Sequence, residues 1–218
     1  MIFEQRFVAG IRDVGEGNRM TNKAILEALN DVTNLHGLSA GQSTRDTGRS
    51  HLAWMVVNWK LRVIRRPQVC EPFIARTWAR EYTRAHGLRD YELVDGQGRV
   101  CALAASRWVA VDTATGSVVR LTPELMDRYE PEPQRVNFPG LAFMRPAIQV
   151  LPDERRARVK VPRGMIDVNG HVHNTAYLDL AAEVMPGDLW RRHFDELEVT
   201  YRKEILPDRT VLLLYGEA

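Results

Sequence analysis

The stretch that decides the fold is TNKAILEALNDVTNLHG, residues 21–37. Its apolar residues recur at the spacing of one helix face, and they are Ile25, Leu29, Val32 and Leu35. Thr21 is a favourable N-cap residue, and Gly37 is typical of a helix end. The pattern predicts one amphipathic helix over this stretch, with its apolar face turned toward a core.

Strand-like segments lie on both sides of this helix in the sequence. One precedes it at residues 3–10, and four follow it at residues 51–64, 71–84, 86–95 and 100–112. The four are rich in Val, Trp, Tyr and Thr, and DGQG at residues 95–98 is a good hairpin turn. A long helix followed by a run of antiparallel strands predicts an α+β arrangement in which a sheet wraps around the helix. That arrangement is the hotdog fold.

The same order of strand, loop, helix and strands occurs a second time. RARVKV, residues 156–161, is typical of a strand, and a loop follows at residues 163–173. Asn174 or Thr175 then begins a helix, whose apolar face is Tyr177, Leu180, Ala181 and Val184. Residues 197–205 and 210–217 are predicted to be strands, with Glu204 on the first of them.

The sequence therefore predicts a double hotdog in one chain. Its parts are an N-terminal hotdog at residues 1–130, a proline-rich linker at residues 131–146, and a C-terminal hotdog at residues 147–218. The second repeat is short, because only two strand-like segments follow its helix. Since an uncovered sheet edge is a liability, we expect pairing with a partner, as in a homodimer, or a shielded edge.

Composition excludes several classes of protein. The chain has 218 residues and a net charge of +2, so bulk charge does not favour nucleic acid as a ligand. The two cysteines, Cys70 and Cys101, form no CxxC pair and no disulfide framework. No apolar segment has the length of a membrane span, and the N-terminus lacks the apolar region of a signal peptide. We expect a reduced, cytoplasmic setting.

A second stretch, IDVNGHVHNTAYLD at residues 166–179, raises the question of chemistry. Asp167, Asn169 and His171 stand at every second position, so they share one side of an extended segment. His171 is a candidate general base, Asp167 could orient it or act as the base, and Asn169 could hold a carbonyl or a water. Glu204 could join them if its strand passes the start of the helix. The alternative is a loop of Asx-turn residues before a helix, with Glu204 simply exposed.

Metal binding is the less favoured interpretation of this stretch. His171 and His173 form an HxH pair near Asp167, but no third His or Cys lies close in sequence. We therefore expect no metal and no cofactor, and we expect His173 to be a surface residue at the start of the helix. Basic residues gather at residues 155–163 and 62–66. They are either solvated strand ends or a surface for an acidic partner or a phosphate.

The residues quoted above resemble a known family. Residues 166–186 resemble the D-x-N-x-H-V-N-N-x-x-Y segment of the acyl-ACP thioesterases of plants and bacteria, and VTYRKEI at residues 199–205 resembles their Y-x-x-E segment. Residues 66–112 are similar to their R-P…T-W…R-D-Y/F-E…S-x-W-V-x-V-D pattern. The resemblance implies a double hotdog of fatty acid biosynthesis that hydrolyses the thioester of a fatty acyl chain on acyl carrier protein (ACP). It places Asp167, Asn169, His171 and Glu204 on active-site positions.

Two departures from the family pattern bear on mechanism. His173 stands where the family often has Asn, and Ile205 stands where plant members carry Cys. Without a Cys nucleophile, the chemistry would use water activated within an Asp167–His171–Glu204 network, or a transient Asp anhydride. The first hotdog would supply the acyl tunnel, from Met20, Leu26, Leu29, Trp54, Met55 and Val57. The alternative for these six residues is plain core.

Three other functions remain open at this point. They are an acyl-CoA thioesterase of the same fold, a non-catalytic hotdog that binds acyl thioesters, and a hydratase or dehydratase hotdog. The product distinguishes them, because only a thioesterase releases a free acid and a thiol.

Overall fold

The computed structural model describes residues 1–42, 51–143 and 155–216. The chain forms two compact units. The first comprises residues 1–142 and 194–200, and the second comprises the described residues of 143–193 and 201–218. No helix among the described residues is both long and apolar enough to cross a membrane.

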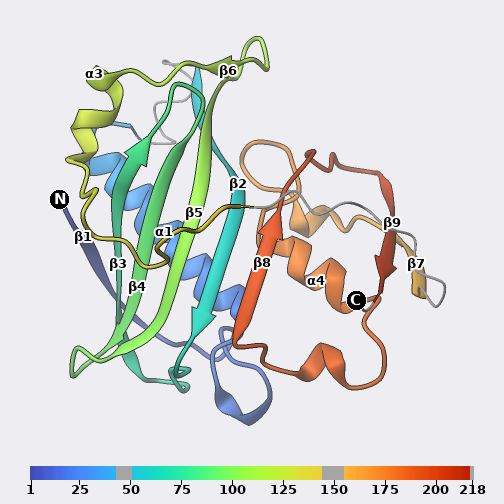
Figure 1. Ribbon diagram of the computed structural model, residues 1–218. Coiled ribbons are helices and arrows are strands. Elements are labelled where there is room, and N and C mark those ends of the chain that lie inside the picture. The colour runs from blue at the N-terminus through green and yellow to red at the C-terminus, as the bar shows by residue number, and fades with distance from the viewer. Residues whose placement is uncertain (43–50, 144–154, 217–218) are drawn as a thin grey trace. The chain divides into compact units, whose positions relative to one another are not determined.

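The first unit is built on one antiparallel sheet (Figure 1). Its strands are β1 (Phe3–Val8), β2 (Leu52–Val63), β3 (Pro72–Tyr82), β4 (Gly87–Asp95), β5 (Val100–Asp112), β6 (Val118–Val119) and β8 (Glu196–Thr200). Their order is β1-β3-β4-β5-β2-β8, and β6 pairs with β5. The four predicted strands after the first helix are confirmed, with ends that shift by no more than two residues.

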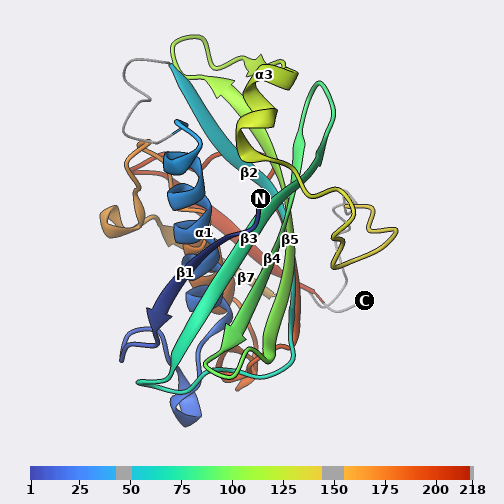
Figure 2. The same cartoon turned by 90° about the vertical axis from the view of Figure 1, so that its left-hand side faces the viewer.

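One long helix, α1 (Asn22–Ser39), lies along one face of this sheet (Figure 2). The Thr21 hydroxyl accepts a hydrogen bond of 3.1 Å from the Ala24 N–H, so the predicted N-cap is confirmed. Ile25, Leu29 and Val32 are buried. The hotdog arrangement of a sheet around a helix is therefore present in this unit. The short helices η1 (Glu16–Asn18), α3 (Pro123–Met126) and η3 (Asp127–Tyr129) complete it.

The last turns of α1 differ from the prediction. Leu35 is 36% exposed, whereas His36 is fully buried. At about 100° per residue, position 36 lies within about 20° of the direction of Ile25, while position 35 lies about 80° away. Gly37 does not end the helix, which continues to Ser39. A glycine is required at this position for another reason: a Cβ there would lie 2.7 Å from the Gln42 carbonyl oxygen, which is too close.

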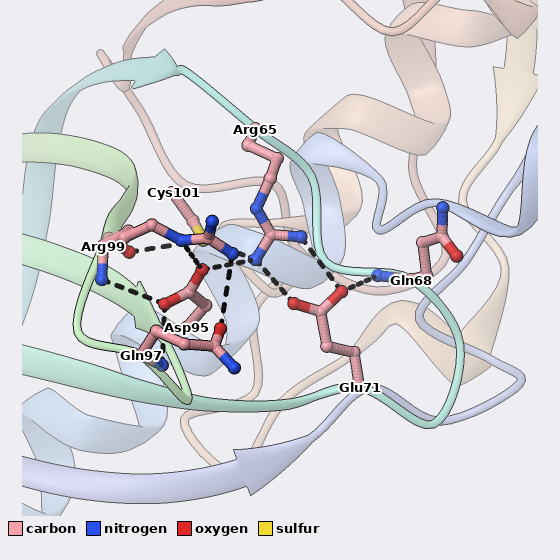
Figure 3. A network of polar contacts seen from close by, with 7 residues as sticks. All are labelled: Arg65, Gln68, Glu71, Asp95, Gln97, Arg99 and Cys101. Carbon is pink, nitrogen blue, oxygen red and sulfur yellow. Dashed lines mark hydrogen bonds and ion pairs between the residues drawn. The ribbon is translucent and has the colours of Figure 1, made fainter.

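Charged side chains join two turns of the first unit (Figure 3). Arg65, in the β2–β3 connection, donates to Glu71 at 2.5 and 3.0 Å and to Asp95 at 3.3 Å. Asp95 begins the predicted DGQG turn and also accepts from Arg99 at 2.8 Å. The thiol of Cys101 is buried beside Arg65, at 3.1 Å from its guanidinium. These bonds hold the β2–β3 and β4–β5 connections together.

Strand β8 corrects the predicted domain boundaries. Residues 147–218 were expected to form one domain, but β8 pairs with β2 of the first unit. In this register, Lys60 and Arg62 lie opposite Glu198 and Glu196 and bond to them at 2.5 and 2.9 Å. Cross-strand pairs of opposite charge favour one register. The strand also ends at Thr200, so the expected continuation to residue 205 is wrong.

The second unit is small, as the sequence predicted. It contains a two-stranded sheet of β7 (Arg155–Lys160) and β9 (Thr210–Tyr215), and the helices η4 (Arg163–Met165), α4 (Ala176–Ala182) and η5 (Leu189–Arg191). The second helix is shorter than predicted, because α4 ends at Ala182, before Val184 of the predicted apolar face. Its core cluster is Val161, Val172, Ala176 and Leu180. The end of the predicted linker and the start of the predicted second domain, residues 144–154, lie outside the described residues.

Candidate active site

The loop before α4 closes on itself through the side chain and backbone of Asp167. Its Oδ1 accepts from the N–H groups of Asn169 at 2.8 Å and of His171 at 3.3 Å. Its own N–H donates to the His171 carbonyl at 2.8 Å. Gly170 completes the turn with a φ of 78°, a backbone conformation that favours glycine. Asp167, Asn169 and His171 are therefore brought together, as the sequence predicted.

This geometry gives Asp167 a structural role. The bond from the Asn169 N–H to its Oδ1 is that of an Asx turn, which was the alternative interpretation of the motif, and the bond from the His171 N–H closes the rest of the loop. The second oxygen, Oδ2, has only a long contact of 3.4 Å from the Asn169 amide. One oxygen of Asp167 thus shapes the loop while the other is lightly engaged. The arrangement fits a structural role, and it leaves an oxygen that could also act on a water.

His171 is the side chain with unused hydrogen-bonding capacity in this loop. Its Nδ1 is buried and has no hydrogen-bond partner among the described residues. Buried polar atoms nearly always have a partner, so an atom of this kind marks a place for a water, a proton or a ligand group. No hydrogen bond joins the His171 ring to Asp167 or Glu204 in the described part of the chain, so the network of these three residues stays a prediction.

A cleft of about 630 Å³ opens beside His171. One side is formed by Asn169, Gly170 and His171, and the other by the turn of residues 206–209. Leu206 gives this turn an apolar residue, and Arg209 gives it a cation. Val168, next to the cleft-lining Asn169, is 91% exposed. Asp208 also lines the cleft, and its carboxylate lies 3.5 Å from Arg163. The cleft thus combines an imidazole, an amide, an apolar residue and one charge of each sign.

Three hydrogen bonds hold residues 201–205 against the start of α4. The Val172 N–H donates to the Ile205 carbonyl at 2.9 Å. The Tyr177 hydroxyl donates to the Lys203 carbonyl at 3.2 Å, and the Tyr201 hydroxyl donates to the Asn174 carbonyl at 2.8 Å. The two tyrosine rings also meet edge to face at 5.1 Å. Tyr177 and Tyr201 are the aromatic residues of the two quoted motifs, so each motif holds the other in place.

Glu204 lies in this segment, but not on a strand. Its side chain is exposed and forms no ion pair with a described residue. Burial raises the pKa of the Tyr177 phenol, and the Glu204 carboxylate raises it further. Because Val172 bonds to Ile205, the residues that precede these two, His171 and Glu204, flank the same contact. The fold therefore brings Glu204 near the loop without bonding it to the loop.

His173 and Ile205 have structural roles. The Nδ1 atom of His173 lies 2.9 Å from the Thr175 hydroxyl and accepts from the Thr175 N–H at 3.3 Å. It therefore stabilises the start of α4, as predicted for a residue at that place, although it is half-buried rather than on the surface. Ile205 packs on the core of the second unit, so its side chain brings no nucleophile to the cleft. No group of three or more His, Cys, Asp or Glu suited to a metal occurs in the described residues.

The six residues predicted to line an acyl tunnel are all in the first unit. Met20, Leu26 and Leu29 are at most 1% exposed. Trp54 packs on a cluster of Ala110, Leu121 and Met126, whereas Met55 and Val57 are half-buried. None of the six lines the cleft beside His171. Their role in binding an acyl chain stays a prediction, because their burial is equally that of core residues.

Sequence reasoning missed some residues of this site. Leu206 and Arg209 line the cleft from a turn that carries no recognisable motif. Tyr177 was assigned only to the apolar helix face. The signal that could have identified its role is that each of the two quoted motifs contains one tyrosine. Two tyrosine rings can pack on each other where the two motifs meet.

Comparison with known proteins identifies the family. Residues 1–129 match the model of the acyl-ACP thioesterase N-terminal domain, and residues 150–217 match that of the C-terminal domain. Oleoyl-acyl carrier protein thioesterase 2 of Arabidopsis thaliana is 26% identical over 96% of this chain and 61% of its own length. Its counterpart from Coriandrum sativum is 23% identical with the same coverage. The chain thus spans about three fifths of the length of these relatives.

Solved structures share the fold. An acyl-ACP thioesterase from Bacteroides thetaiotaomicron has a TM-score of 0.80 at 20% identity, over 96% of this chain and 84% of that one. The 12:0-ACP thioesterase of Umbellularia californica has a TM-score of 0.79 at 19% identity, over 98% and 86%. A protein from Lactobacillus plantarum reaches 0.86, again at 20% identity, over 97% and 81%. The two domain models together cover most of the sequence, and the chain belongs to the acyl-ACP thioesterase family.

Proposed function

We propose that this protein hydrolyses the thioester of a fatty acyl chain on ACP, releasing the free fatty acid and the carrier thiol. The observation that carries the proposal is His171, a histidine that lines an open cleft with its Nδ1 buried and unpaired. Family membership supplies the reaction class. The names of two similar proteins refer to oleoyl-ACP and 12:0-ACP as substrates, so we propose that the acyl group is a fatty acyl chain.

The chemistry follows from the residues around the cleft. His171 removes a proton from water, and the oxygen of that water forms a bond to the thioester carbonyl carbon. The tetrahedral intermediate then collapses, the carbon–sulfur bond breaks, and the departing thiolate takes up a proton. One water is consumed, and one carboxylic acid and one thiol are formed. Asn169, on the same side of the cleft as His171, is placed to hold the carbonyl oxygen or the water.

Asp167 and Glu204 are proposed to act on this step indirectly. Asp167 fixes the backbone from which His171 projects. The Glu204 carboxylate would favour the imidazolium form of His171 once the proton has moved, because an opposite charge nearby stabilises a cation. Ile205 offers no thiol, so attack by water replaces a cysteine-dependent step. The setting in fatty acid biosynthesis, the cytoplasmic location and the homodimer stay predictions.

Thiol release from acyl-ACPs and matching acyl-CoAs tests the proposal. The acyl groups should run from 12:0 to oleoyl, and the variant is His171→Gln, which keeps a polar side chain but removes the base. We expect release from acyl-ACP to fall by about 10²–10⁴-fold. The control is His173→Gln, which retains an acceptor for the Thr175 N–H and should keep the wild-type rate.

Other outcomes would change the proposal. Release from CoA thioesters alone would make the protein an acyl-CoA thioesterase. Acyl binding without thiol release would indicate a binding protein. Undiminished turnover in His171→Gln would remove His171 from the mechanism.

A further inference from the structure

The two groups of basic residues found in the sequence differ in whether their charges are paired within the structure. In the group at residues 62–66, Arg62 pairs with Glu196 and Arg65 pairs with Glu71 and Asp95. Arg66 donates to the carbonyls of Met20 and Phe194. The fold therefore uses this group internally. It leaves little positive charge there for a partner.

The group on β7 is different, because its side chains point away from the core. Exposed and half-buried residues alternate from Arg156 to Lys160 and along the whole of β9, and Arg155 is exposed as well. Val159, Val211 and Leu213 pack on the core of the second unit. The register places Arg156 opposite Leu214, Arg158 opposite Leu212, and Lys160 opposite Thr210. These six exposed residues form the outer face of the β7–β9 sheet.

This outer face is both basic and apolar. It carries three cations and no carboxylate. Arg158 and Lys160 form no ion pair with any described residue, in contrast to the arginines of β2. Leu212 is 52% exposed and Leu214 is 43% exposed. Large apolar side chains at such exposure, between cations, are typical of a surface that another protein covers.

The outer face is continuous with the cleft that contains His171. Arg209, which lines the cleft, is followed directly by Thr210 of β9. The Val161 N–H donates to the Arg209 carbonyl at 2.9 Å, so Arg209 lies beside the end of β7 as well. At about 3.3 Å per residue, the face extends about 13 Å from Thr210 to Leu214. A protein seated on it would hold a thioester arm at the entrance of the cleft.

We propose that the outer face of β7–β9, with Arg209 at its end, is the docking surface for the carrier protein that delivers the acyl thioester. The proposal rests on the proposed function and names the surface that this substrate uses. An acidic carrier with apolar contacts complements both properties of the face. A second copy of this chain is disfavoured, because a two-fold contact would place Arg158 and Lys160 against their own like charges. A bare polyanion would leave the two leucines without a partner.

Charge reversal tests this surface with two substrates. The variants are Arg158→Glu, Lys160→Glu and Leu212→Ser, and the control is Arg155→Glu. Arg155 carries the same charge and is also exposed, at the start of the same strand. Because successive side chains of a strand point to opposite faces, it lies on the side of Ala157 and Val159 and not on the outer face. The substrates are the acyl-ACP that the wild type hydrolyses fastest and the N-acetylcysteamine thioester of the same acyl group. Hydrolysis of the small thioester reports the chemistry without docking.

The expected result is selective. For acyl-ACP, kcat/KM should fall about tenfold in Arg158→Glu and in Lys160→Glu, and the dependence on salt should weaken, because charges at the rim of an interface mainly set the rate of encounter. Hydrolysis of the small thioester should stay at the wild-type rate, and Arg155→Glu should match the wild type with both substrates. Unchanged kcat/KM for acyl-ACP in all three variants would overturn the docking surface and leave the proposed function intact.

A wild-type protein that hydrolyses neither substrate would instead overturn the proposed function. Docking is then measured directly, as binding of fluorescently labelled holo-ACP to the same variants. Weaker binding in Arg158→Glu than in Arg155→Glu would support the surface. Equal binding, or none, would overturn it.

Discussion

Buried His36 predicts a specific loss of stability in acid. Its ring is fully buried, stacks on Phe3 at 5.4 Å, and meets Tyr129 edge to face at 5.3 Å. The Arg89 guanidinium lies 2.8 Å from its Nδ1. Since a guanidinium only donates, Nδ1 accepts and the folded ring is neutral. Burial, the Arg89 charge and the N-terminal amine lower the pKa of His36 to about 3.

The size of the effect follows from proton linkage. The unfolded chain binds a proton at His36 below its ordinary pKa of about 6.5, whereas the folded chain does not do so until about pH 3. Stability from this site is therefore complete above pH 6.5 and falls as the pH decreases toward 3. Because His36 stays neutral in the folded chain, the free energy of unfolding should fall by about 2 kcal/mol between pH 7 and pH 5.

Urea unfolding at pH 7 and pH 5 measures this loss. Tryptophan fluorescence reports the first unit, because four of the five tryptophans lie in it. His36→Gln keeps an acceptor for Arg89 but does not titrate, so the wild type should lose about 2 kcal/mol more than this variant. Val32→Ala, a buried change on the same helix, should lower stability at both pH values and keep the wild-type pH difference. Equal pH dependence in the wild type and His36→Gln would refute the reasoning.

Three further predictions concern single side chains. Tyr177→Phe removes the bond to the Lys203 carbonyl but keeps the ring contact with Tyr201. It should lower kcat for acyl-ACP several-fold with little change in melting temperature, and an unchanged kcat would show that this bond does not position Glu204. Glu71→Gln breaks the ion pair with Arg65 and should cost about 1 kcal/mol in urea unfolding, since the pair is partly exposed; no loss would mean that Asp95 alone holds Arg65. Leu29→Ala should cost about 2–5 kcal/mol if Leu29 is core. A small cost with a shift toward longer acyl chains would instead place it in a tunnel wall.

Much of the first unit was predictable, because its signals are local. The N-cap at Thr21, the apolar positions from Ile25 to Val32 and the DGQG turn each depend on neighbours in sequence. The error at Leu35 was one of residue type, because the helix period already favours position 36, but a histidine is seldom assigned to a core. The Nδ1 of His36 accepts from Arg89, a partner far away in sequence. Strand β8 pairs with β2 of the first unit, and this pairing joins residues some 140 positions apart, which local sequence signals do not reveal.

The site was predicted in part for the same reason. Asp167, Asn169 and His171 come together because a loop of five residues closes on itself. The cleft needs the turn at residues 206–209, which carries no motif, and so sequence alone could not place Leu206 or Arg209 there. The predicted network of His171 depends on the direction in which its ring points, and the spacing of residues in the sequence does not determine that direction. The sequence therefore predicted that the three loop residues lie together, while their roles in the reaction stay a prediction.

The position of β8 has a consequence for how the chain is made. A strand of the first unit is supplied by residues 196–200, which leave the ribosome after residues 143–193, the larger part of the second unit. Until then, β2 presents an unpaired edge along Asn58–Arg62 to whatever is nearby. Pairing across some 140 residues is also slow, because a long loop must close first. During synthesis, the first unit is therefore exposed to wrong strand partners for most of the time that the chain takes to emerge.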